Sequence, residues 1–538
     1  MVARVLAGID IAEHTGPGAA ITPAPAGVTA FVGRTLKGPI NDPIVLHDFA
    51  SFQRIFGGLW QPSTLSYAVE QFFDNGGRTA IVVRVANGAR PATLSVGAAG
   101  ATLTLAALSP GTREHLRAAV DHDGIGPQDD DRFNLVIQRV RGHGSELIED
   151  QEIFRRVSVR RDASRFVGTA LADSRLVRLV GDPPLLRPGV TPPERPGDMI
   201  GYVSAGTDGD DGAALTDYDL IGSAQHGTGL FALRAAPPFE FLCMPPLTRE
   251  HDVGLSTLLV AGRFCRERHA MLVIDPPRDW LDADAALAGL RGWPYRADNA
   301  LMYFPRLTAL DRLRGRSETF APCGAVAGML ARAAASGAPW SPVAQEEVLL
   351  RPGFRPAASI DLAARLRLAQ YGVNTLSAVR LPQLAAATPR TLAAGNASAT
   401  DWRYLGPRRL ALHLAQSVGQ GTRWMQFEQN GPEGGRRAAA QVEAFLAGLD
   451  AEGRSSSSAP GEGWFVICDE RLNEPRHPGA HLLFGYCGSR EGEMHSFLVT
   501  HRAGETRVRP VQANRYTTAA RRVTEEIETG LLRGIGAP

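Results

Sequence analysis

Acidic residues gathered around a glycine are the first place where this sequence could do chemistry. The stretch TDGDDGAALTDYD, residues 207–219, holds several carboxylates close to Gly212. A calcium-binding loop places its ligands at alternating positions before its glycine, and Asp208, Asp210 and Asp211 do not follow that spacing. Because such acidic clusters usually face water, we interpret the stretch as a solvated loop.

A single carboxylate stands in a more suggestive position. Asp275 ends the strand-like run AMLVID, and open α/β sheets bind ligands beyond the carboxyl ends of their strands. Asp-Pro-Pro is also a common turn sequence, and turn preference favours that simpler interpretation. The glycines around His226 in GSAQHGTGL could likewise cradle a phosphate or form a connection, and no following lysine or acidic partner favours the phosphate.

Local signatures of enzymes are absent from the sequence. It contains no H-E-x-x-H, no G-x-S-x-G, no G-x-x-x-x-G-K-[ST], and no G-x-G-x-x-G between a strand and a helix. A Ser/His/Asp site could still assemble from distant residues, but no constellation stands out. The cysteines are far apart, without metal-ligand spacing, and are predicted to be reduced: Cys243, Cys265, Cys323, Cys468 and Cys487. We predict no catalytic, metal-binding or cofactor-binding residue and no cofactor.

Composition narrows the class of protein further. The chain has 538 residues, 44% of them hydrophobic and 21% charged, which is typical of a folded protein with several domains. A net charge of +1 supplies no field for gathering nucleic acid or anionic membrane. No apolar run approaches the ~20 residues that span a bilayer, and the first residues do not resemble a signal peptide. We therefore expect no nucleic-acid partner, no direct membrane insertion, and synthesis in a cytoplasm.

The elements that would position these residues begin as an α/β pattern. A strand is predicted over residues 27–33, helices over 47–58 and 62–75, and a β-branched strand over 79–85. The Gly76-Gly77 pair between the last two could be a ligand-cradling loop or the turn that ends a helix.

Short strand-like segments in polar loops follow from about residue 91 to 196, and indicate an inserted β-rich domain. The α/β pattern then returns with FEFLCMPPL and HAMLVIDPP. In the last third, helices are predicted over 406–421 and 436–449, a strand over 422–428, further strands over WFVICD, HLLFGY and HSFLVT, and a terminal helix over 517–532.

Several of these blocks together resemble a known family. GVTAFVGRTLKGPINDPIVLHDFASFQRIFGGL and SYAVEQFFDNGGRTAIVVRV are similar to the opening of the tail sheath proteins of contractile phage tails and phage-tail-like contractile injection systems. The similarity continues, in family order, through TGLFALRAAPPFEFLCMPPL, CRERHAMLVIDPP and WRYLGPRRLALHLAQSVGQGTRWMQFEQN. It covers roughly residues 27–90 and 165–450.

The resemblance implies an α/β (α+β) multidomain fold with extended terminal arms. The expected parts are an N-terminal arm at 1–26, a discontinuous α/β sheath core at 27–90 plus 197–370, an inserted β-rich outer domain at 91–196, a C-terminal sheath domain with a strand arm at 371–502, and a C-terminal extension at 503–538. The extension could cover a neighbour, contact a cap or baseplate, or pack on its own subunit.

The resemblance also implies a mechanical function rather than an enzymatic one. Subunits of the family stack as hexameric rings around an inner tube, and the sheath contracts to drive the tube through a target envelope. The expected partners are further copies of the chain, the inner tube protein, and baseplate and terminal cap proteins, within a phage tail or phage-tail-like particle made in a bacterial cytoplasm. Two alternatives stay open: a specialised sheath-like component at the cap or baseplate end, and an α/β enzyme.

In the family, arms at both chain ends add strands to sheets of neighbouring subunits. The residues expected to form the arms here are Val2, Val5, Leu6, Ile9 and Ile11 at the start, and Phe497 and Val499 near the end. Strand addition uses backbone groups and so tolerates sequence drift, although each end could instead pair within its own subunit. Asp10 departs from the family's opening pattern, which leaves the register of the first arm open.

Overall fold

A computed structural model gives the structure of the chain over most of its length. It describes residues 20–97, 101–142, 144–193, 201–204, 206–336, 349–379, 388–395, 401–427, 432–451, 463–473, 479–487 and 494–511. The arm residues from Val2 to Ile11 and the expected helix over 517–532 lie outside these ranges. Within them, no helix is both long and apolar enough to cross a membrane.

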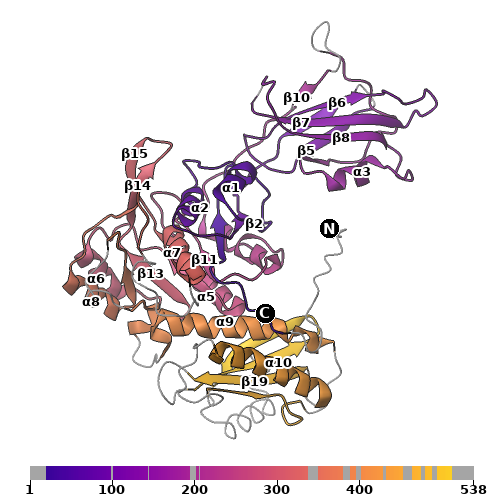
Figure 1. Ribbon diagram of the computed structural model, residues 1–538. Coiled ribbons are helices and arrows are strands. Elements are labelled where there is room, and N and C mark those ends of the chain that lie inside the picture. Colours follow the sequence, from indigo (N-terminus) through magenta and orange to yellow (C-terminus); the bar gives the residue numbers. More distant parts are fainter. Residues whose placement is uncertain are drawn as a thin grey trace.

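A seven-stranded sheet forms the centre of the fold (Figure 1). Its order is β17-β13-β12-β11-β1-β3-β2, and all neighbours are parallel except β2 and β3. The strands are β1 (Thr29–Gly33), β2 (Ile44–Leu46), β3 (Ala80–Arg84), β11 (Phe241–Cys243), β12 (Met271–Ile274), β13 (Ala300–Phe304) and β17 (Val373–Thr375). Because β1 pairs with β11, segments about 200 residues apart in sequence make one sheet.

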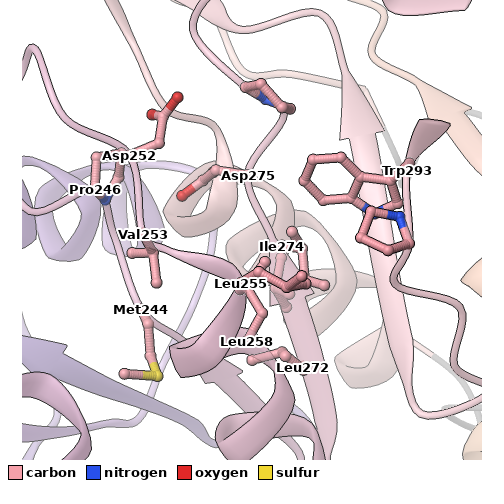
Figure 2. A pocket seen from close by; sticks show the side chains of 13 residues that line it. Met244, Pro246, Asp252, Val253, Leu255, Leu258, Leu272, Ile274, Asp275 and Trp293 are labelled. Carbon is pink, nitrogen blue, oxygen red and sulfur yellow. The ribbon is translucent and has the colours of Figure 1, made fainter. Parts of the chain in front are cut away.

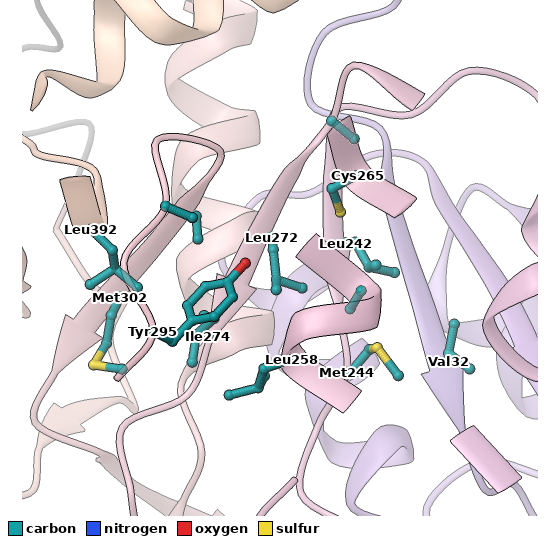
Figure 3. Close-up of a cluster of buried hydrophobic side chains, with 14 of the residues drawn as sticks. Val32, Leu242, Met244, Leu258, Cys265, Leu272, Ile274, Tyr295, Met302 and Leu392 are labelled. Atoms are coloured by element: carbon teal, nitrogen blue, oxygen red, sulfur yellow. The ribbon is translucent and has the colours of Figure 1, made fainter. Parts of the chain in front are cut away.

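Helices cover both faces of this sheet. On one face lie α5 (Leu255–Arg268), α6 (Ala283–Gly292) and α8 (Leu362–Gln370), and on the other α1 (Phe49–Phe56), α2 (Thr64–Asp74) and α7 (Cys323–Ser336). Successive residues of a strand point to opposite faces of the sheet. Val32 and Leu242 therefore enter the first core, beneath α5, α6 and α8, whereas Phe31 enters the second core, beneath α1, α2 and α7. Figure 3 shows the first core around Leu272 and Ile274. Burial on both faces explains the nearly continuous apolar runs in the sequence.

The two glycines after α2 have separate structural reasons. Gly76 has φ of 101°, a left-handed conformation that glycine adopts without strain. At Gly77 a Cβ atom would lie 2.3 Å from the ring of Phe72, so only glycine lets the chain pass this side chain. The pair therefore turns the chain from α2 into β3, which is the second of the two interpretations considered above.

The region between β3 and β11 contains two antiparallel sheets that enclose a separate apolar core, and lies to one side of the central sheet (Figure 1). One sheet consists of β4 (Thr93–Val96), β5 (Leu103–Ala107) and β9 (Val177–Leu179), the other of β10 (Val203–Ser204), β6 (His115–Asp121), β7 (Arg132–Val140) and β8 (Ile148–Ser158). The short helices α3 (Val167–Ala170) and η1 (Leu171–Asp173) pack against this core. The following α4 (Asp217–Ile221) and η2 (Gly229–Ala235) pack instead against the central sheet.

Arg84 secures the junction between this region and the central sheet. It is 1% exposed and donates to the carbonyl oxygens of Gly38 (2.6 Å) and Pro110 (2.8 Å). The outgoing and returning connections also pair with each other at Asn87 with Ala213. The region is thus tied to the core at both of its chain crossings.

A β-hairpin projects from the central domain (Figure 1). Its strands are β14 (Leu307–Asp311) and β15 (Arg316–Phe320), and β16 (Arg355–Pro356) pairs with β14. Asp311, the last residue of β14 before the hairpin turn, is fully buried and accepts a hydrogen bond from Arg249 at 2.7 Å. Arg249 also pairs with Glu318 and lies over the ring of Tyr67. This ionic cluster holds the hairpin to α2.

The last part of the chain forms an α/β layer beneath a long helix (Figure 1). Helices α9 (Leu405–Gly421) and α10 (Pro432–Ala451) cover a sheet of β18 (Trp464–Ile467), β19 (Ala480–Cys487), β20 (Met494–Arg502) and β21 (Glu505–Val511), in that order. Short 3-10 turns precede and follow α9: η5 (Leu392–Gly395), η6 (Asp401–Arg403) and η7 (Arg423–Gln426).

The strand expected over residues 422–428 is wrong. The chain instead continues from α9 into η7, which buries the consecutive residues Trp424 and Met425. Trp424 Nε1 donates to Gln441 Oε1 of α10 at 2.9 Å. A strand would direct these neighbouring side chains to opposite faces, whereas the turn directs both into the same core.

Candidate assembly site

The two C-terminal residues expected to belong to an arm lie inside the last sheet. Phe497 and Val499 are in β20, which pairs with β19 on one side and β21 on the other. Both side chains are buried under the helices, and the ring of Phe497 stacks on Phe484 with 5.4 Å between centroids. Because both edges of β20 are occupied within the subunit, β18 and β21 form the outer edges of this sheet in the described structure. A role for Phe497 and Val499 in an arm stays a prediction.

One outer edge of this sheet is β18. Cys487 N donates to Gly463 O at 2.7 Å, and hydrogen-bonded pairs alternate along an antiparallel ladder. The backbone groups of Trp464 and Val466 therefore point away from β19. Among the described residues β18 pairs only with β19, so these groups form an edge to which another strand can be added.

The opposite edge, β21, is partly blocked. The two-residue turn between Arg502 and Glu505 sets the alternation of the β20–β21 hairpin. It directs the backbone groups of Thr506, Val508 and Pro510 outward. Proline has no N–H, so a strand added here would lose one ladder hydrogen bond. Of the two edges, β18 is the better acceptor.

The N-terminal segment reaches the same domain before it enters the central sheet. We call residues 20–27 the arm root, since they follow the expected arm residues. Ala24 N donates to Ser417 Oγ of α9 at 2.9 Å, and Ile21 lies against Gly421, where a Cβ would stand 2.7 Å from its Cγ1. The arm root thus contacts α9 before the chain enters the central sheet.

Helix α9 belongs to two cores at once. Leu405 and Leu412 pack into the core of the central sheet, whereas Leu414 and Val418 pack against the C-terminal sheet. In Figure 1 the helix lies between the two sheets. It therefore packs against both the central domain and the C-terminal sheet.

A buried ion pair joins α9, the central sheet and the arm root. Arg409 Nε lies 2.5 Å from Glu240 Oε1, and the other carboxylate oxygen accepts from Gly27 N at 2.6 Å. The Arg409 side chain is 1% exposed and its guanidinium lies over the ring of Phe241. Glu240 precedes β11, so one carboxylate connects three segments that are far apart in sequence.

The neighbouring arginine extends this contact. Arg408 pairs with Asp298 at 3.3 Å and lies over the ring of Trp402. Facing α9, His269 ends α5 in a left-handed conformation, with φ of 54°. Burial, together with Arg408 and Arg268, lowers the pKa of His269 to about 4, so this imidazole is neutral at pH 7.

Sequence reasoning missed the importance of this contact. The signal that could have found it is the Arg408-Arg409 pair inside an otherwise apolar helix pattern, since a charged pair on a buried face requires partners. The partners themselves, Glu240 and Asp298, lie far from α9 in the sequence, so no local pattern pairs them with it.

The residues first considered for chemistry have structural contacts. Asp210 pairs with Arg90 at 2.9 Å, and Asp211 accepts from Thr112 N at 2.8 Å, so the acidic stretch helps to connect the inserted region. His226 lies 3.0 Å from Ser223 Oγ in a local turn. Asp275 accepts from Cys323 N at 2.7 Å at the start of α7. Across the described part of the chain, no three His, Cys, Asp or Glu residues are grouped to hold a metal ion.

Comparison with known proteins relates the fold to sheath proteins. No protein-family model and no curated protein matches this chain. The sheath tail protein of Listeria innocua matches in structure with a TM-score of 0.59 and 12% identity, over 92% of this chain and 98% of that chain. The sheath of the extracellular contractile injection system PVC, in its contracted state, matches with a TM-score of 0.51 and 13% identity, over 92% and 96%. The chain therefore has the α/β multidomain fold of contractile sheath proteins.

Proposed function

We propose that this chain is a structural subunit of a contractile tail sheath. The observation that carries the proposal is the extent of the structural match, which covers 92% of this chain and 98% of the Listeria innocua sheath tail protein. In this role, subunits form hexameric rings that stack around an inner tube protein. Baseplate and terminal cap proteins bound the stack at its ends.

The sheet edges and the arm root suggest how subunits are linked. The segment before the arm root leaves one subunit beside α9 and adds a strand to the β18 edge of a neighbour. Such pairing is made by backbone hydrogen bonds, with side-chain pockets adding specificity. A linkage of this kind can persist between proteins of 12–13% identity, because it depends little on side chains.

Contraction requires a folded subunit that can pack against its neighbours in two ways. A contact that does not close on itself generates a helical stack, whereas one that closes generates a ring. If repacking releases a few kcal/mol per subunit, the sum over a long sheath is large. In this mechanism the linked strands keep neighbours joined while the domains rearrange.

Electron microscopy of the chain expressed with its cognate tube protein tests the proposal. We expect rings and long sheaths, and persistent monomers would refute it. Deleting Met1 to Ile11 should leave a folded subunit that does not form long extended sheaths. Normal sheaths from that deletion would refute the assignment of the arm.

A pair of substitutions at Val466 tests the acceptor edge separately. Val466→Pro removes an outward N–H without removing a hydrogen bond to β19, so the subunit should fold but assemble poorly. Val466→Thr keeps the N–H and a similar shape, and serves as the matched control. Equal assembly by both variants would exclude β18 as the acceptor.

Counting copies of the chain per particle distinguishes a main sheath subunit, present in many rings, from a terminal component present in one.

A further inference from the structure

A cavity of about 330 Å³ lies beyond the carboxyl ends of β11 and β12. Figure 2 shows its lining, which is mostly apolar: Met244, Val253, Leu255, Leu258, Leu272 and Ile274. Its volume falls in the range of roughly 300–1,000 Å³ that small-molecule sites occupy, and its position is the one at which open α/β sheets bind ligands. The proposed assembly contacts do not use it.

Two polar atoms in the lining lack partners. Asp275 Oδ2 and Trp293 Nε1 are both buried, and neither makes a hydrogen bond to any described residue. The other oxygen of Asp275 is engaged by Cys323 N at 2.7 Å, which fixes the carboxylate in place. Leaving a buried donor or acceptor unpaired costs about 1–3 kcal/mol, so each atom favours a ligand that would pair with it.

The other carboxylate in the lining, Asp252, has hydrogen-bond partners within the protein. Asp252 pairs with Arg306 and accepts from Arg278 N at 2.7 Å. Arg306 also donates to Pro276 O at 3.1 Å. Arg306 is therefore engaged by Asp252 and a carbonyl, and Asp275 Oδ2 stays without a hydrogen bond.

We propose that this cavity binds a small organic amine with an apolar body and one acceptor oxygen. The ammonium group donates to Asp275 Oδ2, the oxygen accepts from Trp293 Nε1, and the body fills the space between Leu258, Leu272 and Ile274. A neutral apolar molecule would leave the carboxylate unpaired, and an anion would be repelled by it.

The ionisation of Asp275 adds a pH dependence. Burial raises the pKa of Asp275 to about 6. The side chain and backbone N–H of Cys323 and the positive charge of Arg306 lower this pKa, whereas the negative charge of Asp252 raises it. These groups and the buried thiol of Cys243 are the titratable neighbours of the carboxyl. An ammonium ligand pairs with the ionised form, so binding should be strongest above pH 6 and weaken below it.

The experiment titrates the purified full-length chain with tyramine at pH 7.5, by ligand-observed NMR and calorimetry. Tyramine has the amine, the aromatic body and a phenol oxygen, and we expect saturable binding with Kd of roughly 1 mM or tighter. 4-Ethylphenol has the same body without the amine and should bind at least tenfold more weakly. Absence of saturable tyramine binding up to ~10 mM, or equal binding of the two compounds, would overturn the proposal.

Variants locate the site. Asp275→Asn keeps an acceptor for Cys323 N but removes the charge, and should weaken tyramine binding at least tenfold. Asp284→Asn changes a carboxylate whose side chain is 91% exposed and should leave binding unchanged. Leu255→Trp, at the exposed start of α5, narrows the cavity and should abolish binding even if Asp275→Asn fails to fold. Unchanged binding by Leu255→Trp would refute the location. The measurement uses unassembled subunits, so it does not depend on sheath formation.

Discussion

Replacing Glu240 by alanine should loosen the arm root from the subunit. The substitution removes the only carboxylate that pairs with Arg409 in the described structure and the acceptor for Gly27 N. Arg409 is 1% exposed, so its charge would stay buried without a counter-charge. The arm root would then keep one polar tie to α9, the hydrogen bond from Ala24 N to Ser417 Oγ.

The size of the effect follows from burial. Removing one partner of a buried ion pair typically costs about 3–5 kcal/mol, and a buried N–H without an acceptor costs about 1–3 kcal/mol. Water entering the space left by the carboxylate offsets part of both. We therefore expect residues 20–27 to open about 3 kcal/mol more easily, and their amides to exchange about 100-fold faster.

Hydrogen exchange measured by mass spectrometry on peptides from residues 20–27 is the appropriate assay. It reports local opening, whereas a chain of several domains need not unfold in one two-state transition. Glu267→Ala is the matched control, because it breaks the exposed pair of Arg263 and Glu267 on α5, which contributes less than about 1 kcal/mol. Its effect on exchange at the arm root should be negligible.

A double substitution separates the lost pair from the unpaired charge. Adding Arg409→Met to Glu240→Ala removes the buried charge and should recover a large part of the protection. The reasoning would be refuted if Glu240→Ala changed exchange of the arm root by less than threefold. It would also fail if the double variant exchanged faster than the single one, because the unpaired charge would then not be the cause.

Three further outcomes are expected. Burial, together with His481 and Arg423, lowers the pKa of His501 to about 4 in the folded chain. In the unfolded chain this imidazole has its usual pKa of ~6.5, so as the pH falls it is protonated there before it is protonated in the folded chain. Stability of the C-terminal domain should fall by ~2 kcal/mol between pH 7 and 5, and His501→Gln should remove that dependence in urea titrations. The pKa of Asp311 is below its usual value. Burial alone would raise this pKa, but the hydrogen bonds from Arg249 and from backbone N–H groups lower it by more than burial raises it. The contribution of Asp311 to hairpin stability is therefore complete above pH ~4 and is lost at lower pH, which amide exchange of β14 and β15 at pH 6 and 3 would detect. Gly77→Ala places a Cβ 2.3 Å from the Phe72 ring and should cost about 1–3 kcal/mol, measured as a lower Tm.

Much of the first α/β unit could be predicted from sequence. Strand β1, helices α1 and α2, and strand β3 lie where periodicity placed them, because their signals come from residues near one another in the chain. Ser63 illustrates this, since it caps the start of α2 by accepting a hydrogen bond from the backbone N–H of Ser66, three residues along the chain. The apolar runs AMLVID and FEFLC likewise became buried strands.

Other features could not be predicted because their causes lie far away in sequence. The 422–428 segment reads as a strand in isolation, and only the core under α9 and α10 makes it a turn. The expected domain boundary at residue 370 would separate β17 from the central sheet, to which it belongs through β13. A strand of three residues carries too little sequence pattern to indicate which strand it pairs with. Nothing near Arg84 indicates that its guanidinium is buried against Gly38 and Pro110.

The sequence alone determined the secondary structure of the best-patterned segments, the absence of common catalytic motifs, and the resemblance to sheath proteins. The tertiary structure decided that Phe497 and Val499 lie in a strand paired on both sides, that β18 is the more open edge, and that Glu240 holds both Arg409 and the arm root. The physical reason is range. Helix and strand patterns depend on neighbours within a few residues, whereas a sheet edge or a buried ion pair exists only once distant segments have packed together.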